Sequence, residues 1–590
     1  MSRLPVAAAL VVLAGLLSPA PSSAQLTQLL PEVTYESGVE FTPHGPVAIH
    51  VVRGPRPVGL YRLRPVLSNE AVVGRETLSA MQRRLSSQAT SVGVNGDYFS
   101  RADGRPSGIF LRDGVLANPP NSARSSTGVT LDGLLDVRRV RFLGTWRGLG
   151  QRRALNFLNK APGANGISLF TSEWGPSTPR IPGAFAVVLS PFPPATPNTD
   201  LAVPVTAVSQ NGPVRIVPGT AVLVARGNAA TKLQAEAPPG ATVTVRLILQ
   251  PDWAVVSDAI GGGPLLVRDG KPVFRANEAF SIAQLAPRGP RSAVGQRADG
   301  GILLVTTDGR QPGYSVGMTN FELALTLVRL GAVRAMALDG GGSSTLAFEG
   351  TVLNSPSDGR ERAISNALLL QYHGVYVPPP AEEVLSPNGD GVAETQRLGF
   401  KVVRPSTVTV TLVGPDGTVA AQESAPHDPG SYEVPFPPQV APPPPGSPPQ
   451  PPQPPVEGRW TLTVTATDDQ GLPSSASRRF SVNSTLGSLR IEPARLLLPP
   501  RGANATVRWS QSRPARVRLT IETPEGVVVH TVSSKRHDPG ERSVVWNGRG
   551  GNGKPVAGGR YLARLTATNE LGVVSLARPF SVKRVARPKR

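Results

Sequence analysis

Short apolar–polar alternations run through the first two thirds of the chain and predict a β-rich domain. The stretches VAIHVV at 47–52 and GLYRLR at 59–64 alternate as half-buried strands do, and SVGVN at 91–95 predicts a strand that ends in a polar cluster. Helical spacing is rarer. Residues 76–87 place apolar side chains on one side, and 319–330 begins with a TNFE capping box and stops before a glycine. Because this second helix is apolar nearly all round, we expect it to be buried.

After residue 376 the pattern changes to a diverged repeat of alternating strands. The stretch RPSTVTVTL at 404–412 corresponds to RPARVRLTI at 513–521, and both copies continue with HDPG, a Gly-Arg-aromatic strand and Phe-Ser-Val. Two such copies, joined by turn residues, predict two β-sandwich modules. A proline-rich run at 437–455 interrupts the first copy and predicts a polyproline-II loop without a packed core.

The first 24 residues have the pattern of an export signal. Arg3 precedes an apolar run at 6–17, and small residues follow at 19–24. The run is shorter than the ~20 apolar residues that a spanning helix needs, which favours a Sec-type signal peptide, cleaved near Ala24–Gln25, over a membrane anchor. We therefore expect a secreted, periplasmic or cell-surface protein with no transmembrane span in the mature chain. The sequence holds no cysteine, so disulfides and a lipid-modified N-terminal cysteine are excluded.

The formal net charge of +20 has two interpretations. It attracts polyanions such as phosphate-containing wall polymers or acidic glycans, or it is an arginine-rich background spread over a solvated surface. The second interpretation suits most of the charge, since the dense basic run is the tail KRVARPKR at 583–590. Nucleic acid is not an expected partner, because the aromatic side chains that would stack on bases are not interleaved with the basic ones.

The stretch ALDGGGSSTLAFEG at 337–350 stands between two apolar runs, where a flexible linker has no place. Three glycines inside a core cost roughly 0.5–1 kcal/mol each relative to alanine, so a ligand or a backbone must come close. Successive Gly-Gly-Ser amides can form a concave anion nest, and the two serine hydroxyls can add donors. A tight structural turn is the alternative. A phosphate-loop NTPase is excluded, since the lysine is missing and the glycine spacing is wrong.

Several motifs occur in one order along the first domain. They are NGDYF at 95–99, GGGPLL at 261–266, Pro290-Arg291, DGR at 308–310, GMT at 317–319, LDGGGSST at 338–345 and Arg362-x-x-x-Asn366-Ala-Leu. In this order the stretch from about 45 to 375 resembles the phosphodiester glycosidase family. The resemblance implies hydrolysis of a sugar–O–phosphate–R diester at the anomeric carbon, which yields free sugar and a phosphomonoester.

The matching positions suggest roles for such a site. The diester is an anion, and bidentate guanidinium groups suit it. A carboxylate must stabilise an oxocarbenium-like transition state or activate water, whereas the acidic phosphomonoester needs little general-acid help on leaving. The candidate residues are Asp339, with Asp97 and Asp308, for catalysis; Arg291, Arg310 and Arg362 for the phosphate charge; Asn95 and Asn366 for sugar hydroxyls; and Gly340, Gly341, Gly342, Ser343 and Ser344 for phosphate oxygens.

Each carboxylate also has a structural interpretation. Asp308-Gly309 is a good hairpin turn, and Asp97 and Asp339 are able to cap neighbouring backbone amides. Histidine adds nothing to the site, because the sequence shows no histidine–serine hydrolase triad and no cluster of zinc ligands. We therefore predict no metal and no cofactor.

The two modules resemble the Ig-like domain of flagellar hook-capping proteins. The matching stretches are LSPNGDG at 385–391 and WNGRGGNGKPV at 546–556. The NGDG loop lacks the spacing and the final acidic residue of an EF-hand, so we interpret it as a turn. The resemblance implies spacer or anchoring modules, with an envelope or cell-wall polymer as the expected partner.

These observations predict an α+β catalytic domain with mixed β-sheets and few helices, followed by two all-β Ig-like sandwiches. The expected boundaries are 1–24 for the signal peptide, 25–376 for the catalytic domain, 377–384 for a Pro-rich linker, 385–484 and 485–583 for the modules, and 584–590 for the basic tail. The expected substrate is an anionic phosphoglycan or sugar phosphodiester, and the N-acetylglucosamine type is one candidate. Two alternatives stay open: a phosphodiesterase that cleaves the P–O bond, and a non-catalytic glycan-binding or adhesion protein.

Overall fold

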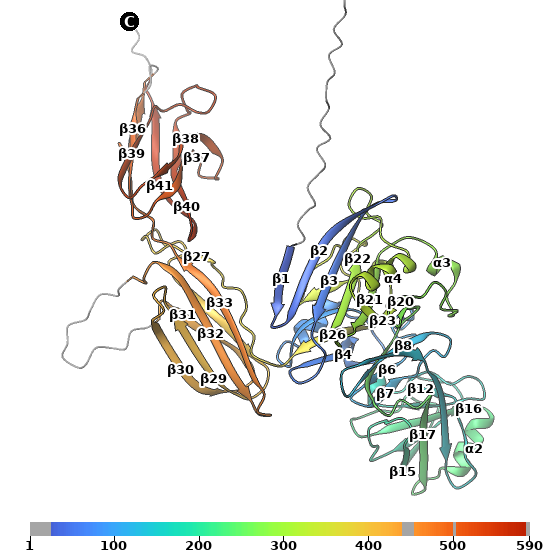
Figure 1. Ribbon diagram of the computed structural model, residues 1–590. Helices are drawn as coiled ribbons and strands as arrows, with labels where there is room; N and C mark the ends of the chain where they lie inside the picture. The colour runs from blue at the N-terminus through green and yellow to red at the C-terminus, as the bar shows by residue number, and fades with distance from the viewer. Residues whose placement is uncertain (1–24, 439–453, 500–502, 586–590) are drawn as a thin grey trace, which may run out of the picture. The chain divides into compact units, whose positions relative to one another are not determined.

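A computed structural model describes residues 25–438, 454–499 and 503–585 (Figure 1). Apart from the short segment Ser87–Thr90, one compact unit ends at Tyr372 and a second begins at His373. The predicted signal peptide, most of the proline-rich insertion and the end of the basic tail lie outside the described residues. Within the described ranges, no helix has both the length and the apolar character needed to cross a membrane.

The first unit consists of four β-sheets with few helices, which confirms the expected fold class. Most strand pairs are antiparallel, whereas β12 (Phe157–Leu158) and β13 (Ile167–Phe170) pair in parallel, so the sheets are mixed. One eight-stranded sheet has, in spatial order, β1 (Gln25–Leu30), β2 (Val33–Thr42), β3 (Gly45–Gly54), β22 (Ile302–Thr307), β21 (Arg291–Arg297), β23 (Ala332–Ala337), β19 (Leu265–Arg268) and β20 (Lys271–Pro272).

Two five-stranded sheets complete the part of the unit that holds the predicted motifs. The first has the order β25 (Thr351–Val352), β24 (Leu346–Phe348), β5 (Thr90–Asn95), β26 (Asn366–Tyr372), β4 (Tyr61–Leu67). The second has the order β7 (Val115–Asn118), β6 (Phe110–Arg112), β18 (Val256–Gly261), β8 (Ser125–Thr130), β9 (Leu135–Arg139). The expected strands at 47–52, 59–64 and 91–95 correspond to β3, β4 and β5.

The remaining sheet of this unit is formed mainly by the middle of the domain. Its order is β11 (Arg153–Leu155), β10 (Arg141–Arg147), β17 (Thr242–Gln250), β15 (Asp200–Gln210), β14 (Ala184–Leu189), β16 (Ala221–Arg226), β13 and β12. Its apolar side chains form a large core cluster that also includes Ile109 and Leu111 near β6 and Val256 and Ala259 on β18. This core fixes the strands β6 and β18, whose ends approach the candidate site.

Four α-helices are described: α1 (Leu78–Arg84), α2 (Asn228–Glu236), α3 (Ile282–Leu285) and α4 (Asn320–Arg329). The capping box of α4 is present, with Thr319 and Glu322 each bonding the other's backbone amide. Figure 1 shows α4 beside the large sheet, where Leu323 and Leu327 are buried against it. Our expectation of all-round burial is wrong, because Leu325 is 41% exposed on the opposite side.

The second unit contains the two Ig-like modules, each a sandwich of two sheets. The first has β27 (Val384–Leu385), β33 (Pro473–Val482), β32 (Gly458–Asp468), β29 (Ser406–Val413) and β30 (Val419–His427) facing β28 (Gln396–Val402) and β31 (Gly430–Phe436). The other has β35 (Arg495–Leu498), β41 (Gly572–Arg584), β40 (Gly559–Asn569), β37 (Ala515–Glu522) and β38 (Val528–His537) facing β34 (Leu486–Glu492), β36 (Ala505–Gln511) and β39 (Gly540–Trp546).

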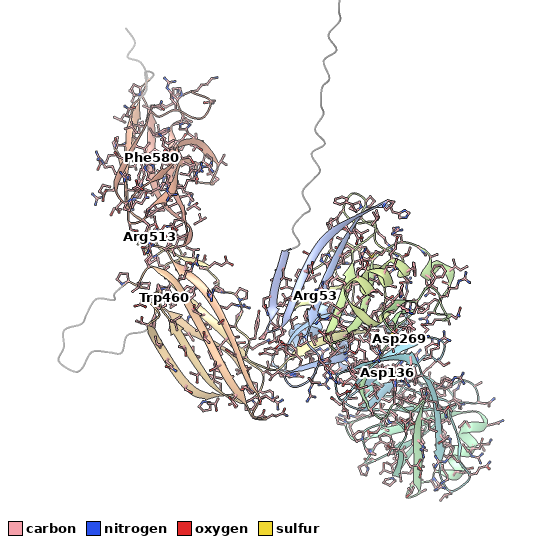
Figure 2. The ribbon with its side chains drawn as sticks, viewed as in Figure 1. Arg53, Asp136, Asp269, Trp460, Arg513 and Phe580 are labelled. Carbon is pink, nitrogen blue, oxygen red and sulfur yellow. The ribbon has the colours of Figure 1, made fainter. Side chains whose placement is uncertain are left out.

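The repeat seen in the sequence is also a repeat of topology. In each module the first strand of the larger sheet, β27 or β35, pairs in parallel with the last, β33 or β41. Trp460 and Phe580, labelled in Figure 2, are both buried, one in the core of each module. Val375, at the end of the expected catalytic domain, and Val377, at the start of the expected linker, are also buried in the first core, so both contribute to that module.

Candidate active site

Three neighbouring strands of the large sheet bring predicted residues to one edge. Strand β21 pairs antiparallel with both β22 and β23, so β22 and β23 run in the same direction and end at the edge where β21 begins. Asp308 follows β22, Asp339 comes two residues after β23, and Arg291 is the first residue of β21. The topology therefore places an arginine between the ends of two strands that lead into aspartates.

A second sheet meets this edge through hydrogen bonds. Gly96, after β5, donates its amide to Asn366 O at 2.9 Å and accepts the amide of Asp339 at 2.9 Å. Asn95 donates its Nδ2 to Asp339 O at 2.6 Å. The NGD and LDG motifs, more than 240 residues apart, are thus joined through their backbones. This arrangement brings Asp97 and Asp339 to the same site.

The Asp97 carboxyl is 2% exposed and closely surrounded by glycines. Gly108 donates its amide to Asp97 Oδ2 at 2.5 Å, and a Cβ atom on Gly261 would stand 2.5 Å from the same oxygen. Burial raises the pKa of Asp97 to about 7, and the charge of Asp339 acts in the same direction, whereas the Gly108 amide and Arg124 oppose the rise. Asp97 is therefore able to hold a proton near neutral pH.

The carboxyl group of Asp339 also has a raised pKa, as that of Asp97 does. Burial raises its pKa to about 6, although the nearby Ser343 hydroxyl, Arg362 and Arg101 favour the charged form. The Ser343 hydroxyl lies close enough to affect this carboxyl without making a hydrogen bond of ordinary geometry. Two carboxyl groups that influence each other titrate as a pair, and in such pairs one group can be ionised while the other keeps its proton.

Arg291 is a buried cation without a carboxylate partner among the described residues. It is 9% exposed and donates to two carbonyl oxygens, Met318 O at 3.1 Å and Pro287 O at 2.5 Å. Burial lowers its pKa, and the charge of Arg310 lowers it further, with Tyr98 opposing. A buried guanidinium group that is repelled by a second guanidinium is a favourable place for an anion.

The three consecutive glycines each face a different arginine. A Cβ atom on Gly340 would stand 3.4 Å from Arg291 Nη1, one on Gly341 would stand 3.1 Å from Arg310 Nη2, and one on Gly342 would stand 2.0 Å from Arg362 Nη2. Gly341 also has a φ of 67°, which favours glycine. The missing side chains therefore let three guanidinium groups approach one turn, and this close approach rules out a flexible linker.

The three arginines differ in how far their charge is compensated. Arg362 pairs with Asp358 at 2.6 Å. Arg310 is exposed and, like Arg291, has no ion pair in the ranges that the structure describes. The predicted arginines thus converge at the glycine turn, and two of them keep an uncompensated positive charge.

Several buried polar atoms around this turn have no partner among the described residues. They are the hydroxyl oxygens of Ser343, Ser344 and Thr345 and the Nδ2 of Asn366. Asn366 uses its other amide atom, Oδ1, to accept the amide of Asp97 at 2.8 Å. Unsatisfied buried groups are rare in native proteins, and a concentration of them fits a site that binds a polar ligand or water.

Asp308 is a correction to the predicted site. Its fully buried carboxylate accepts hydrogen bonds from His50 Nε2 at 2.9 Å, Tyr314 Oη at 3.0 Å, Asn354 Nδ2 at 2.8 Å and the Ser355 amide at 3.0 Å. A carboxylate with four donors has no oxygen free for catalysis, so Asp308 braces the loops around it. The alternative of a hairpin turn at Asp308-Gly309 is wrong as well, because β22 and β23 do not form a hairpin.

Asn95 also differs from its predicted role. Its Oδ1 accepts the Ser292 hydroxyl at 2.6 Å and the Thr345 amide at 3.1 Å, while its Nδ2 donates to Asp339 O. The side chain is fully buried and its polar atoms are occupied, so it positions the Asp339 segment instead of contacting a sugar.

The structure adds three residues that the sequence did not single out. Tyr98 interacts electrostatically with Asp97, Asp339 and Arg291, and its pKa is raised by burial. The Arg124 guanidinium lies 5.1 Å from the centroid of the Tyr98 ring, and Arg101 acts on Asp339. Tyr98 could have been found as part of the NGDYF motif, whereas Arg101 and Arg124 carry no local signal. Among the described residues, no group of three metal-binding side chains occurs.

Comparison with known families supports this interpretation of the site. Residues 198–371 match the phosphodiester glycosidase family, and residues 501–570 match the FlgD Ig-like domain. The first match includes Arg291, Arg310, Asp339, the glycine turn and Arg362, but it begins after Asp97. Over these residues the chain is similar to phosphodiester glycosidases.

Individual relatives are similar over limited regions. An uncharacterized SPbeta prophage-derived protein of Bacillus subtilis, YomE, is 35% identical over 158 residues, which cover 27% of this chain and 24% of that protein. The chain thus matches about a quarter of that relative's length. A hypothetical protein from Synechocystis is 25% identical with a TM-score of 0.50, covering 60% of this chain and 64% of the other. The catalytic domain of zebrafish N-acetylglucosamine-1-phosphodiester alpha-N-acetylglucosaminidase is 16% identical with a TM-score of 0.33, covering 59% and 87%.

Proposed function

We propose that the first unit hydrolyses the glycosidic bond of a sugar 1-phosphodiester and releases free sugar and a phosphomonoester. The observation that carries this proposal is the pair Asp97 and Asp339, with pKa values raised to about 7 and about 6, beside two arginines that have no carboxylate partner within the described part of the chain. Paired carboxyl groups suit glycoside hydrolysis, and uncompensated guanidinium groups suit a phosphodiester anion.

The positions of the groups suggest a division of roles. Arg291 and Arg310 would hold the phosphate oxygens, with the hydroxyls of Ser343 and Ser344 as further donors. Asp339 is partly exposed and has the lower pKa, so we assign it the role of the carboxylate that stabilises the anomeric centre or activates water. Asp97 would keep its proton over a wider pH range and lend acidic help to departure of the phosphate, which leaves readily because its second pKa is about 6.

The location and partners of the enzyme are part of the same proposal. The signal-like N-terminus favours export, and an exported enzyme with this site would act on a cell-envelope or extracellular phosphoglycan. The Ig-like modules would space or anchor the catalytic unit at an envelope polymer. An N-acetylglucosamine 1-phosphodiester is the first substrate to try.

A product test separates this function from its rivals. The whole chain is incubated with a panel of sugar 1-phosphodiesters, and free reducing sugar and sugar phosphate are quantified beside Asp339→Asn. We expect free sugar from the wild type and at least about a hundredfold less from the variant. Release of sugar phosphate would instead show a P–O phosphodiesterase. Binding without turnover over the whole panel would support a non-catalytic binding protein.

A further inference from the structure

A groove of about 670 Å³ lies next to the candidate active site in the same unit. Its walls come from Pro264 and the start of β19, the segment 273–286 and the start of α4, and they include Phe274, Phe280, Ile282, Leu285 and Phe321. The volume is in the range of small-molecule sites, roughly 300–1,000 Å³. The catalytic roles assigned above use none of these side chains.

Two contacts join the groove to residues of the candidate active site. The Phe280 ring is 5.4 Å from the Tyr98 ring, and the Arg124 guanidinium lies 4.1 Å from the centroid of Phe280. At another point of the wall, Thr319 follows Met318, whose carbonyl oxygen accepts from Arg291 Nε. Groove and site therefore share walls at Phe280 and at the residues before α4.

The lining includes exposed apolar side chains together with the exposed polar residues Arg275 and Asn277. Phe274 and Ile282 are 72% and 83% exposed, which is unusual for two large apolar side chains on one short segment. Glu278 also lines the groove, but its carboxylate accepts from the Ser125 amide and hydroxyl and from the Leu265 amide. The acidic group is thus held by protein donors, and Arg275 is the other charged residue of the lining.

We propose that this groove binds a hydrocarbon chain attached to the phosphate, so that the substrate is a sugar 1-phosphodiester of a long-chain alcohol. The inference rests on the proposed function and names its leaving group. Water adds to the anomeric carbon and gives one proton to Asp339. The bond from that carbon to the phosphate oxygen breaks, and an alkyl phosphate that takes a proton from Asp97 leaves with its chain in the groove. Arginines at one end and apolar walls beyond them match the two parts of this product.

Binding of the product tests the groove without any need for turnover. Calorimetry on the whole chain compares octyl phosphate with inorganic phosphate. Each methylene that becomes fully buried strengthens binding about fourfold, so we expect octyl phosphate to bind at least about tenfold more tightly, even with partial burial. Phe274→Ser and Ile282→Ser should each reduce that advantage at least about threefold and leave phosphate binding unchanged.

A matched control is Leu149→Ser, which removes an equally exposed leucine outside the groove (70% exposed). It should change neither affinity. Octyl phosphate that binds no better than inorganic phosphate, or does not bind, overturns the proposal. An equal loss in the control variant also overturns it.

Hydrolysis of methyl and octyl diesters of the same sugar phosphate separates the two proposals. If kcat/KM is equal for both diesters and the two phosphates bind equally, the proposed role of the groove is wrong and the proposed glycosidase activity stands. If octyl phosphate binds preferentially but neither diester is hydrolysed, the proposed glycosidase activity is wrong and the proposed role of the groove stands.

Discussion

Two aspartates at neighbouring strand ends have opposite environments. Asp308 follows β22 and Asp339 comes just after β23, and each precedes a glycine. Four donors surround Asp308, whereas burial raises the pKa of Asp339 to about 6 against the opposing effects of Ser343, Arg362 and the Gly340 amide. The neighbours differ as well, since His50 Nε2 contacts Asp308, while Arg291 and Arg310 have no carboxylate partner among the described residues. We therefore assign a structural role to Asp308 and keep Asp339 as the proposed catalytic carboxylate.

The largest effect should come from Asp339→Asn. An amide cannot supply the negative charge that the transition state needs, so kcat/KM for a sugar 1-phosphodiester should fall by about 10³-fold. The melting temperature should not fall, because the amide is neutral and the buried charge is removed. Steady-state kinetics and thermal unfolding check both parts. Asp299→Asn, at an exposed surface pair with Arg297, should leave kinetics unchanged, and a similar loss in this control would contradict the assignment.

The next effect tests the uncompensated positive charge. Arg291→Gln should lower kcat/KM about 10²-fold, mainly by weakening recognition of the phosphate, and should weaken binding of inorganic phosphate. The control is Arg329→Gln, since Arg329 pairs with Glu40 at the surface and lies outside the site. If both variants bound phosphate as the wild type does, Arg291 would have no role in anion binding.

Asp308→Asn should reverse the pattern by lowering stability instead of turnover. The amide turns a donor toward groups that are themselves donors, so the free energy of unfolding should fall by about 2–3 kcal/mol. Chemical denaturation measures the loss. The fraction of variant that remains folded should keep kcat within about threefold of the wild type. A stable variant with abolished turnover would return Asp308 to the catalytic group.

The smallest effect is a pH dependence of stability from Asp97. Its pKa is near 7 in the folded protein and near 4 when unfolded, so between these values the folded state binds more protons and stability falls as pH rises. The Asp97→Asn variant has no carboxyl group here to titrate, so its stability should not fall with pH for this reason. We expect the variant to match the wild type near pH 4 and to exceed it by at least about 1 kcal/mol at pH 8, as measured by denaturant titration. A constant difference across this range would contradict the raised pKa.

Local signals were enough for parts of the fold and insufficient for parts of the site. The capping box at Thr319 and the strand at Thr90–Asn95 depend on neighbouring residues, and both were predicted from the sequence. Asp308 and Asp339 have similar local patterns, TTDGR and ALDGG, and cannot be distinguished locally. The donors that occupy Asp308 come from His50, Tyr314, Asn354 and Ser355, which only the folded chain brings together.

The contacts of the glycine turn also depend on residues that are far apart in the sequence. In the sequence, the three glycines predict that a ligand or a backbone comes close, and the three arginines are predicted to bind the phosphate without any link to particular glycines. That each glycine faces one of those arginines depends on the register of β21 and β23 and on the loops after β22 and before β26. Arg124 precedes β8 and Tyr98 follows β5, and these strands belong to different sheets. No pattern near either residue therefore predicts their contact.

The most direct measurement is hydrolysis of an N-acetylglucosamine 1-phosphodiester by the whole chain in ¹⁸O-labelled water, with mass spectrometry of both products. If the carboxyl pair acts at the anomeric carbon while the arginines hold the phosphate, the label will be found in the free sugar, and Asp339→Asn will form almost none of it. Label found in the phosphate would show attack at phosphorus and contradict the assignment of Asp339 and Arg291.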